Sequence, residues 1–355
     1  MKTDEIITNS RQKWQIRDKT LIFTGLLFLV IILFTLDIFF GSVSIKPSEV
    51  IHAIFNSSDK ALETIIFKFR IPKALTALIV GIALSLSGLQ MQTVFRNPMA
   101  GPYVLGISSG ASLGVAFVIL GFSSQISPGS IQGLGNWALA AASWLGAGAV
   151  MILIMFISVR VRDIMTVLIL GIMLSSGISA IVSIMQYFTN ETMLKAYVIW
   201  TMGSLGNLTY QQLQVLLISV CAGVILNVIS VKMLNALLLG ENYATSIGLN
   251  VRFARLIIFA GTSILAGSVT AFCGPIGFIG IAVPHIARII FRTSDHKTLI
   301  PATIFIGGSV MLLSDIISQL PGSDSVLPVN SVTSLVGIPV VIWVILRNRK
   351  YSGAF

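Results

Sequence analysis

The sequence predicts an all-α, polytopic membrane protein of about ten transmembrane helices, and three observations lead to this fold class. Hydrophobic residues make up 55% of the 355 residues, and charged residues only 10%. The mean hydropathy is correspondingly high, at +0.93. A soluble domain carries roughly 25% charged residues, so little of this chain is suited to water. Each spanning helix uses about 20 apolar residues, which leaves room for roughly ten spans and no second soluble domain.

Ten apolar runs, each bounded by charges, prolines or polar clusters, are the candidate spans. They cover residues 20–41, 72–95, 102–122, 137–159, 165–188, 212–233, 253–272, 276–292, 299–320 and 328–346. The run at 276–292 is the shortest, and residues 196–205 predict a further half-helix. We therefore expect a cytoplasmic segment at 1–19, one transmembrane domain at 20–347 and a cytoplasmic tail at 348–355.

The positively charged residues indicate how the chain is oriented. Lysine and arginine beside spanning helices are retained in the cytoplasm. With the N-terminus inside, most of the 23 lysines and arginines fall on inner connections. Those that fall outside are Lys46, Lys60, Lys68, Arg70, Lys73 and Lys195. We expect both termini to be cytoplasmic, and the net charge of +10 to reflect membrane orientation rather than a nucleic-acid-binding face.

Three of the outer cations, Lys68, Arg70 and Lys73, lie within one short stretch, "KFRIPK". Two interpretations are open. The side chains can extend to lipid headgroups of the outer leaflet, as long cationic side chains do. Alternatively they form a docking patch for an acidic partner outside the cell.

The stretch "RNPMAGPYVLGISSGASLG" predicts a break between two spans followed by close helix packing. Arg96 ends a helix, and Asn97-Pro98 favours a turn. Gly106, Gly110 and Gly114 then recur every four residues, a spacing that lets helix backbones approach closely in lipid.

The stretch "GPIGFIGIAVPHIARIIF" places Pro284 and His285 in a short helix that ends near Arg288. A histidine beside a proline kink can shuttle protons or bind a metal ion. No second ligand accompanies it in the sequence, so a structural histidine is the favoured interpretation.

The connection "LLLGENYATSIGLNV" predicts a short helix between two spans. Gly240 ends the preceding helix, and residues 241–247 can form about two turns that Gly248 ends. A helix lying along the membrane is a handle by which a cytoplasmic protein can push on the spans. An ordinary loop remains open as the alternative at this point.

Several functions are disfavoured by what the sequence lacks. It has no G-x-x-x-x-G-K-[ST] phosphate loop and no constellation of nucleophile, base and oxyanion donors, so we expect neither nucleotide hydrolysis nor other enzyme activity from this chain. Carboxylates within the apolar runs are nearly limited to Asp37 and Asp315. An ion-coupled transporter needs such groups, and Asp315 would be its coupling residue. A membrane scaffold is the third alternative.

Taken together, the motifs resemble the FecCD family of permeases, the membrane subunits of type II ABC importers for iron-siderophores, haem and cobalamin. The matching stretches are "FRIPKALTALIVGIALSLSGLQMQ", "RNPMAGPYVLGISSGASLG", "WTMGSLG", "LGENYATSIGLNV", "GPIGFIGIAVPHIAR" and "LPVNSVTSLVGIPVVIW". The resemblance implies ten helices, a second permease subunit of the same or another kind, two cytoplasmic ATPases and an external binding protein. ATP and magnesium would bind the ATPases, and this chain would hold no cofactor.

The resemblance also implies roles for particular residues. Arg70 and Lys73 would receive acidic side chains of the binding protein, with Lys68 as an addition. The ATPase-contacting helix maps onto Glu241, Asn242, Ala244, Ser246 and Gly248. The cytoplasmic gate maps onto Ile164 and Met165.

Departures from the family pattern bear on the substrate. Ile164 and Met165 are bulkier and more apolar than the small hydroxyl residues associated with the cobalamin member. We therefore expect a ferric siderophore as the substrate, with haem or cobalamin as alternatives. Gln319 stands where some members carry another docking arginine, and Asn330 replaces the usual glycine in "LPVN".

Overall fold

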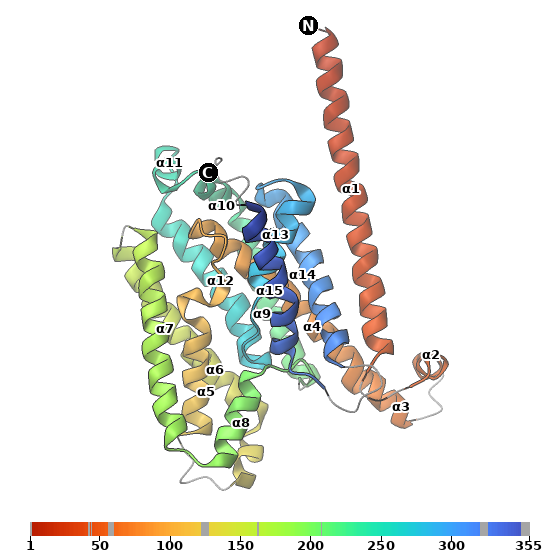
Figure 1. The fold of residues 1–355 in the computed structure, drawn as a ribbon, viewed down its shortest axis with the longest axis vertical. Helices are drawn as coiled ribbons and strands as arrows, with labels where there is room; N and C mark the ends of the chain where they lie inside the picture. The colour runs from red at the N-terminus through yellow and green to blue at the C-terminus, as the bar shows by residue number, and fades with distance from the viewer. Residues whose placement is uncertain are drawn as a thin grey trace.

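The computed structural model describes residues 2–41, 43, 45–55, 60–121, 128–161, 163–206, 208–319 and 326–348, and the regular structure in these residues is helical. The helices form a bundle whose long members run side by side, with short helices at its two ends (Figure 1). The predicted all-α fold class is confirmed.

Within the described ranges, seven helices are long and apolar enough to cross a membrane. They are α1 (Lys2–Phe39), α4 (Ile71–Val94), α6 (Pro128–Arg160), α7 (Ile164–Tyr187), α9 (Tyr210–Ile229), α12 (Val251–Cys273) and α14 (His296–Ser318). Three further apolar helices are α5 (Ile107–Ile119), α13 (Ile279–Phe291) and α15 (Val329–Asn348). Each of the ten predicted spans therefore corresponds to one apolar helix.

The remaining α-helices lie at the ends of the bundle (Figure 1). At one end are α2 (Pro47–Phe55), α3 (Lys60–Thr64) and α8 (Glu191–Thr201), and at the other are α10 (Val231–Leu238) and α11 (Glu241–Ser246). Helix α8 is the predicted half-helix. It begins earlier than expected because the Asn190 side chain accepts a hydrogen bond from the Met193 amide and caps the first turn.

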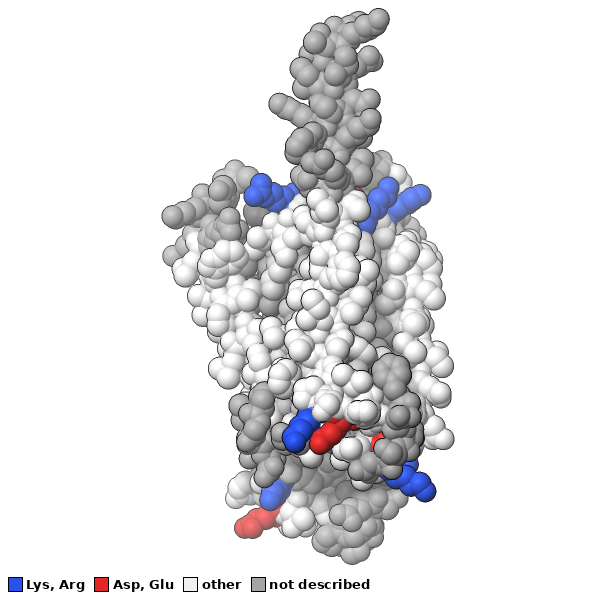
Figure 2. Space-filling view, turned by 90° about the vertical axis from the view of Figure 1, so that its right-hand side faces the viewer, with Lys and Arg blue, Asp and Glu red and all other residues white. Residues whose placement is uncertain are grey.

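Charged side chains on the surface follow the same division. In Figure 2 the blue and red residues gather in two zones at the two ends, with a broad uncharged band between them. Helix α1 begins and α15 ends at the same end as α10 and α11 (Figure 1). An apolar band flanked by two charged zones is the surface of a protein that spans a membrane.

Helix α4 is the centre of the bundle. In its most apolar window 83% of the residues are buried, compared with 28% in α7. A Cβ placed on Gly81 would lie 2.2 Å from the carbonyl oxygen of Gly307 in α14, and one on Gly88 would lie 1.8 Å from that of Gly280 in α13. The backbones of α4, α13 and α14 thus touch, which only glycine permits at these crossings.

Helices α5 and α6 approach each other in the same way. A Cβ on Gly110 would lie 2.4 Å from the carbonyl oxygen of Gly146, and one on Gly114 would lie 2.0 Å from that of Ala142. The predicted close packing is confirmed for these two glycines. Gly106 serves a different purpose: its φ of 81° makes the left-handed turn into α5 from the 3₁₀ helix Pro102–Leu105.

We expect Gly88→Ala to destabilise the protein strongly, because the added methyl group meets the Gly280 carbonyl and the crossing of α4 and α13 must widen. Overpacking of this kind costs about 1–3 kcal/mol or more. The matched control is Gly148→Ala in α6, where an added Cβ has nothing within 4 Å. Thermal unfolding of the purified variants in detergent measures the effect. Equal melting temperatures for Gly88→Ala and Gly148→Ala would contradict the backbone contact.

Candidate functional site

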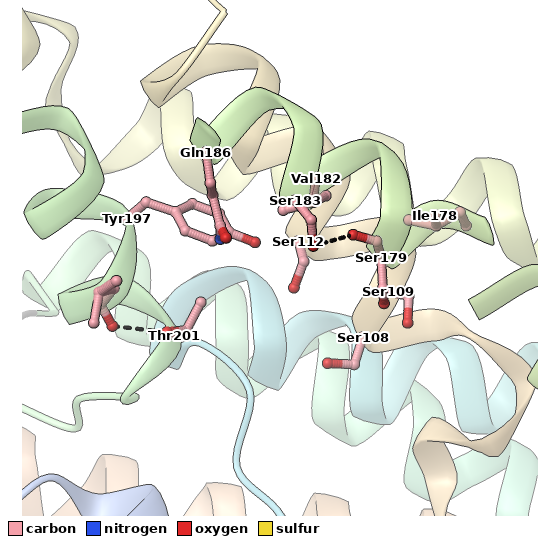
Figure 3. A pocket seen from close by; sticks show the side chains of 11 residues that line it. Ser108, Ser109, Ser112, Ile178, Ser179, Val182, Ser183, Gln186, Tyr197 and Thr201 are labelled. Atoms are coloured by element: carbon pink, nitrogen blue, oxygen red, sulfur yellow. Dashed lines mark hydrogen bonds between the residues drawn. The ribbon is translucent and has the colours of Figure 1, made fainter. Parts of the chain in front are cut away.

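A hollow lined by hydroxyl groups lies between α5, α7 and α8. Its volume is about 270 Å³, and its lining includes three serines of α5, Ser108, Ser109 and Ser112. Figure 3 shows these serines across from Ser179 and Ser183 of α7. Gln186 and Tyr197 lie at one end of the hollow, and Thr201 of α8 completes its polar wall (Figure 3).

A second hollow of about 610 Å³ adjoins the first, because Ser108, Ser109 and Ser179 line both. It adds the α7 side chains Ser175 and Ser176. Among the described residues that line the two hollows, none is an aspartate, glutamate, lysine or arginine. We call the hydroxyl-bearing side chains that line these two hollows the hydroxyl wall.

Some of the hydroxyl hydrogens of this wall are used within the helices. Ser183 donates to the carbonyl oxygen of Ser179 at 2.9 Å, Ser176 to that of Ile172 at 3.1 Å and Thr201 to that of Val198 at 2.7 Å. A serine in a helix commonly makes this bond to the preceding turn. Each of these oxygens can still accept a hydrogen bond, and a serine hydroxyl that is not bonded within its helix can also donate, so the wall offers both acceptors and donors to a molecule in the hollow.

Helix α7 becomes apolar towards its start. Met165, Ile169 and Ile172 are about half exposed, at 46%, 55% and 51%. Of the two predicted gate residues, Met165 is exposed, whereas Ile164 is buried and packs into the core. The hydroxyl wall therefore ends in an apolar stretch at the first turns of α7.

Asp163 fixes the start of α7. Its carboxylate accepts hydrogen bonds from the Thr166 hydroxyl and from the backbone amides of Met165 and Thr166. These bonds, first that from the Thr166 side chain and then those from the amides, hold the pKa of Asp163 below its ordinary value. Asp163 is thus ionised at neutral pH, which keeps the N-terminus of α7 capped.

The predicted short helix is present as α11, between Gly240 and Gly248, both of which have positive φ. Ala244 is fully buried and holds the helix against the bundle, while Asn242 and Ser246 are exposed. Glu241 points inward and forms an ion pair with Arg255 of α12. Sequence reasoning did not single out Tyr243 and Ile247, which are 47% and 56% exposed and give α11 an apolar outer face.

The structure places the three cations of the predicted docking patch differently from one another. Lys68 is exposed. Arg70 is only 7% exposed, and its guanidinium donates to the carbonyl oxygens of Ile38 and Phe39, both at 2.9 Å, and of Val43 at 2.6 Å. Arg70 therefore caps the C-terminal end of α1, where a cation is favoured. The sequence predicts Arg70 as a surface cation, but the structure buries it.

Lys73 also has an internal partner. Its Nζ lies 3.1 Å from Oδ1 of Asp315, which is fully buried in α14. Gln319 donates to Asp315 and to Asp37 of α1, both at 3.0 Å. The glutamine that replaces a docking arginine thus links two carboxylates instead. Asp315 is ion-paired and lies outside the hydroxyl wall, which disfavours the role of coupling residue in an ion-driven transporter.

The turn after α4 is held by α13. His285 donates through Nε2 to the carbonyl oxygen of Pro98 at 2.8 Å, so it is a structural histidine, as the sequence favoured. Asn97 accepts a hydrogen bond from the Met99 amide. Arg96, which is exposed, has a φ of 46° at the end of the helix. Pro284 is buried inside α13.

Two further motif residues have structural partners. Arg288 donates to Oε1 of Gln92 at 2.7 Å, and Nε2 of Gln92 donates to the Ile281 carbonyl, so α4 and α13 are also tied by side chains. Asn330 lies in the first turn of α15 and accepts a hydrogen bond from the Gly277 amide at 2.9 Å. Its φ is negative, so the position does not require the usual glycine.

The hydroxyl wall was not predicted from the sequence. Its serines come from two helices separated by about sixty positions, and serine every three or four residues in an apolar run is also common where helices pack closely. The signal that could have found it is the spacing of Ser176, Ser179 and Ser183 on one face of the span.

A bundle of spanning helices with an uncharged polar wall and a short helix at one end defines a membrane transport protein. The chain belongs to the FecCD transport family, whose model matches residues 29–347. It is therefore a permease of a type II ABC importer, and the ATPase activity belongs to a partner subunit.

Named relatives cover most of the chain. It is 35% identical over 328 residues to the vitamin B12 import system permease protein BtuC of Klebsiella pneumoniae, with 92% of this chain and 93% of the relative covered. The protein of the same name from Escherichia coli O9:H4 is 35% identical over 292 residues, covering 81% and 85%.

Solved structures agree with the fold. A transporter described as of the metal-chelate type, in an inward-facing conformation, superimposes with a TM-score of 0.79 at 27% identity and covers 92% of this chain and 99% of its own. PsaBC from Streptococcus pneumoniae in complex with Fab has a TM-score of 0.53 at 17% identity, covering 84% and 95%. The second likeness supports the fold alone.

We expect Arg70→Gln to lower the melting temperature of the purified protein. The change leaves the carbonyl oxygens at the end of α1 without their cationic donor, and an unsatisfied buried polar group costs about 1–3 kcal/mol. Lys68→Gln is the matched control, since this lysine is exposed two residues away. If both substitutions leave the melting temperature unchanged, the capping role of Arg70 is wrong.

Proposed function

We propose that the chain is one of two permease subunits of an importer that moves a metal chelate inward, powered by ATP hydrolysis in separate cytoplasmic subunits. A metal chelate is a metal ion wrapped in a large polar organic ligand. The observation that carries the proposal is the hydroxyl wall between α5, α7 and α8. It is polar without being charged, so it can solvate such a ligand without binding it too tightly to be released.

Cobalamin is the first candidate substrate, in place of the ferric siderophore expected from the sequence. Two observations support it. The named relatives are vitamin B12 permeases. The hydroxyl wall presents both acceptors and donors, which suit the N–H and C=O groups of the amides around a corrin ring.

A ferric siderophore is the second candidate. The observation that favours it is Met165, a bulky apolar side chain exposed at the start of α7 where a small hydroxyl residue is associated with cobalamin transport. Haem is less well suited, because a largely apolar porphyrin gains little from a wall of hydroxyl groups.

The partners and orientation follow from the two ends of the bundle. The exposed face of α11, with Tyr243 and Ile247, would contact the ATPase, and both termini, which lie at the same end of the bundle, would then be cytoplasmic. The opposite end would receive an external binding protein. Lys68 is the cation of the predicted patch that is exposed there, whereas Arg70 and Lys73 would support the docking surface from inside.

Uptake into proteoliposomes tests the function. The chain is reconstituted with its cognate ATPase and binding protein, and vesicles receive either radiolabelled cyanocobalamin or radiolabelled ferrichrome, a ferric hydroxamate. We expect ATP-dependent accumulation of cyanocobalamin, because a permease without an ATPase site has no energy source of its own. Uptake that a proton gradient sustains without the ATPase would contradict the proposal.

The two radiolabelled compounds also distinguish the two candidate substrates. ATP-dependent uptake of ferrichrome but not of cyanocobalamin would exchange the first candidate for the second.

Lys68→Glu should slow uptake at low concentrations of binding protein and increase its dependence on salt, because charge complementarity mainly sets association rates. Uptake unaffected by Lys68→Glu would exclude this lysine from docking.

The hydroxyl wall has its own test. We expect the double variant Ser179→Ala and Ser183→Ala to lower kcat/KM for uptake about tenfold, since a hydrogen bond contributes about 0.5–1.5 kcal/mol and 1.4 kcal/mol corresponds to a factor of ten. Ile184→Ala is the control, because it truncates an exposed side chain of α7 that lines neither hollow. Equal uptake by both variants would remove the wall from the pathway.

A further inference from the structure

One buried side chain joins α11 to the connection between α6 and α7. Arg255 of α12 is only 3% exposed. Its Nε and Nη2 donate to Oε1 of Glu241 at 3.0 and 2.5 Å, and Nη2 also donates to Oε2 at 2.6 Å. Glu241 is the first residue of α11, so the guanidinium holds this helix at its N-terminal end.

The other edge of the guanidinium contacts the segment that leads into α7. Nη1 donates to the carbonyl oxygen of Val161 at 3.1 Å and lies 3.5 Å from that of Ser158. Val161 follows directly after the end of α6, and two residues later Asp163 caps α7. Through one rigid group, α11 is therefore connected to the start of the helix that carries the hydroxyl wall.

The chemistry of arginine makes this connection stiff. A guanidinium is planar, always charged and presents its donors in a fixed fork. Removing one partner of a buried ion pair leaves an uncompensated charge, which is strongly unfavourable. Glu241 cannot move away alone, because its departure would strip the buried guanidinium of its countercharge.

A second tie holds the neighbouring helix α10 but leads elsewhere. Asn235 donates to Asp295 at 2.7 Å and accepts from the His296 amide at 2.9 Å. His296 in turn lies 2.9 Å from the Thr93 hydroxyl. This tie connects α10 with α14 and α4, the centre of the bundle. Among the described residues, the hydrogen bonds of Arg255 link α11 to the connection that leads into α7.

We propose that Arg255 is a positioning residue that transmits movement of α11 to the start of α7, and that transmission requires its simultaneous hold on the Glu241 carboxylate and on the carbonyl oxygens of Val161 and Ser158. The inference rests on the proposed function, because it assigns a route from the ATPase to the pathway. When nucleotide binding shifts α11, the connection before Asp163 shifts with it, and the exposed Met165 moves at the apolar end of the pathway.

A purely structural role for Arg255 would give different results in a charge exchange. In the double variant Glu241→Arg and Arg255→Glu, an ion pair can form again and hold α11 in place. A glutamate at position 255, however, cannot donate to the carbonyl oxygens of Val161 and Ser158. The exchange therefore separates the anchoring of α11 from the bridge to α7.

The test measures access to the start of α7 in the assembled complex. Met165→Cys is introduced as a reporter together with Cys221→Ser, which removes the exposed native cysteine. The rate of labelling by a water-soluble maleimide is compared without nucleotide and with ATP plus vanadate. ATPase activity and size-exclusion chromatography monitor assembly. Couplings between sites typically correspond to about 5–150-fold, and we expect a nucleotide-dependent change in labelling rate within this range.

In the reporter background, Arg255→Gln and the charge exchange should both reduce this change to below about twofold, a loss of most of the coupling. The charge exchange should nevertheless retain ATPase activity and assembly. Arg252→Gln, the same substitution at an exposed position of the same helix, should keep the full change. If Arg255→Gln does not assemble, the charge exchange decides alone.

A full nucleotide response in the charge-exchanged complex would overturn the relay, as would a full response in Arg255→Gln. A reporter complex that assembles but shows no nucleotide response even with Arg255 intact would contradict the coupled permease itself, and the relay with it.

Discussion

The structure depends on the backbone-to-backbone contacts that α4 makes with α13 and α14. In lipid, apolar helices gain nothing from leaving water, so they associate through close packing and shared polar groups. Gly81 and Gly88 supply the close packing with α14 and α13. Buried side chains supply the rest: Gln90 accepts from Thr262 of α12 at 2.8 Å, and Gln92 is bound by Arg288 of α13. Helix α4 and its partners thus form a fixed frame.

Against this frame, α7 is held loosely. Large apolar side chains such as Ile169, Met173 and Ile184 are more than half exposed, and few residues of the helix are buried. In the proposed function, this uncovered surface leaves room for a second permease subunit and allows α7 to move without breaking the core. What controls it is its start, where Asp163 caps the first turn and Arg255 holds the preceding carbonyl oxygens. In the proposed function, the well-buried α4 stays in place while the more exposed α7 moves.

The sequence predicted the features that are local in the chain. Spans were readable from apolar length and the packing of α5 from its glycine spacing, whereas residues 241–247 left a short helix and a loop equally open until the family resemblance favoured the helix. The structural role of His285 was also expected. What the sequence could not supply are partners far apart in the chain. Arg70 meets the carbonyl oxygen of Ile38, and Lys73 meets Asp315, and no local pattern distinguishes a cation that turns inward from one that reaches outward. The hydroxyl wall was missed for the same reason, since its two faces belong to different helices.

The central claim is that α11 and the start of α7 move as one unit. Pulsed electron paramagnetic resonance on the assembled complex tests it most directly, with spin labels at Thr245 in α11 and Ile169 in α7, both of which are exposed. The distance between these labels within one subunit should stay constant between the nucleotide-free and the ATP-bound states, while the distance between Ile169 labels in the two permease subunits changes. A distance within the subunit that changes while the two α7 helices separate or close would contradict the account.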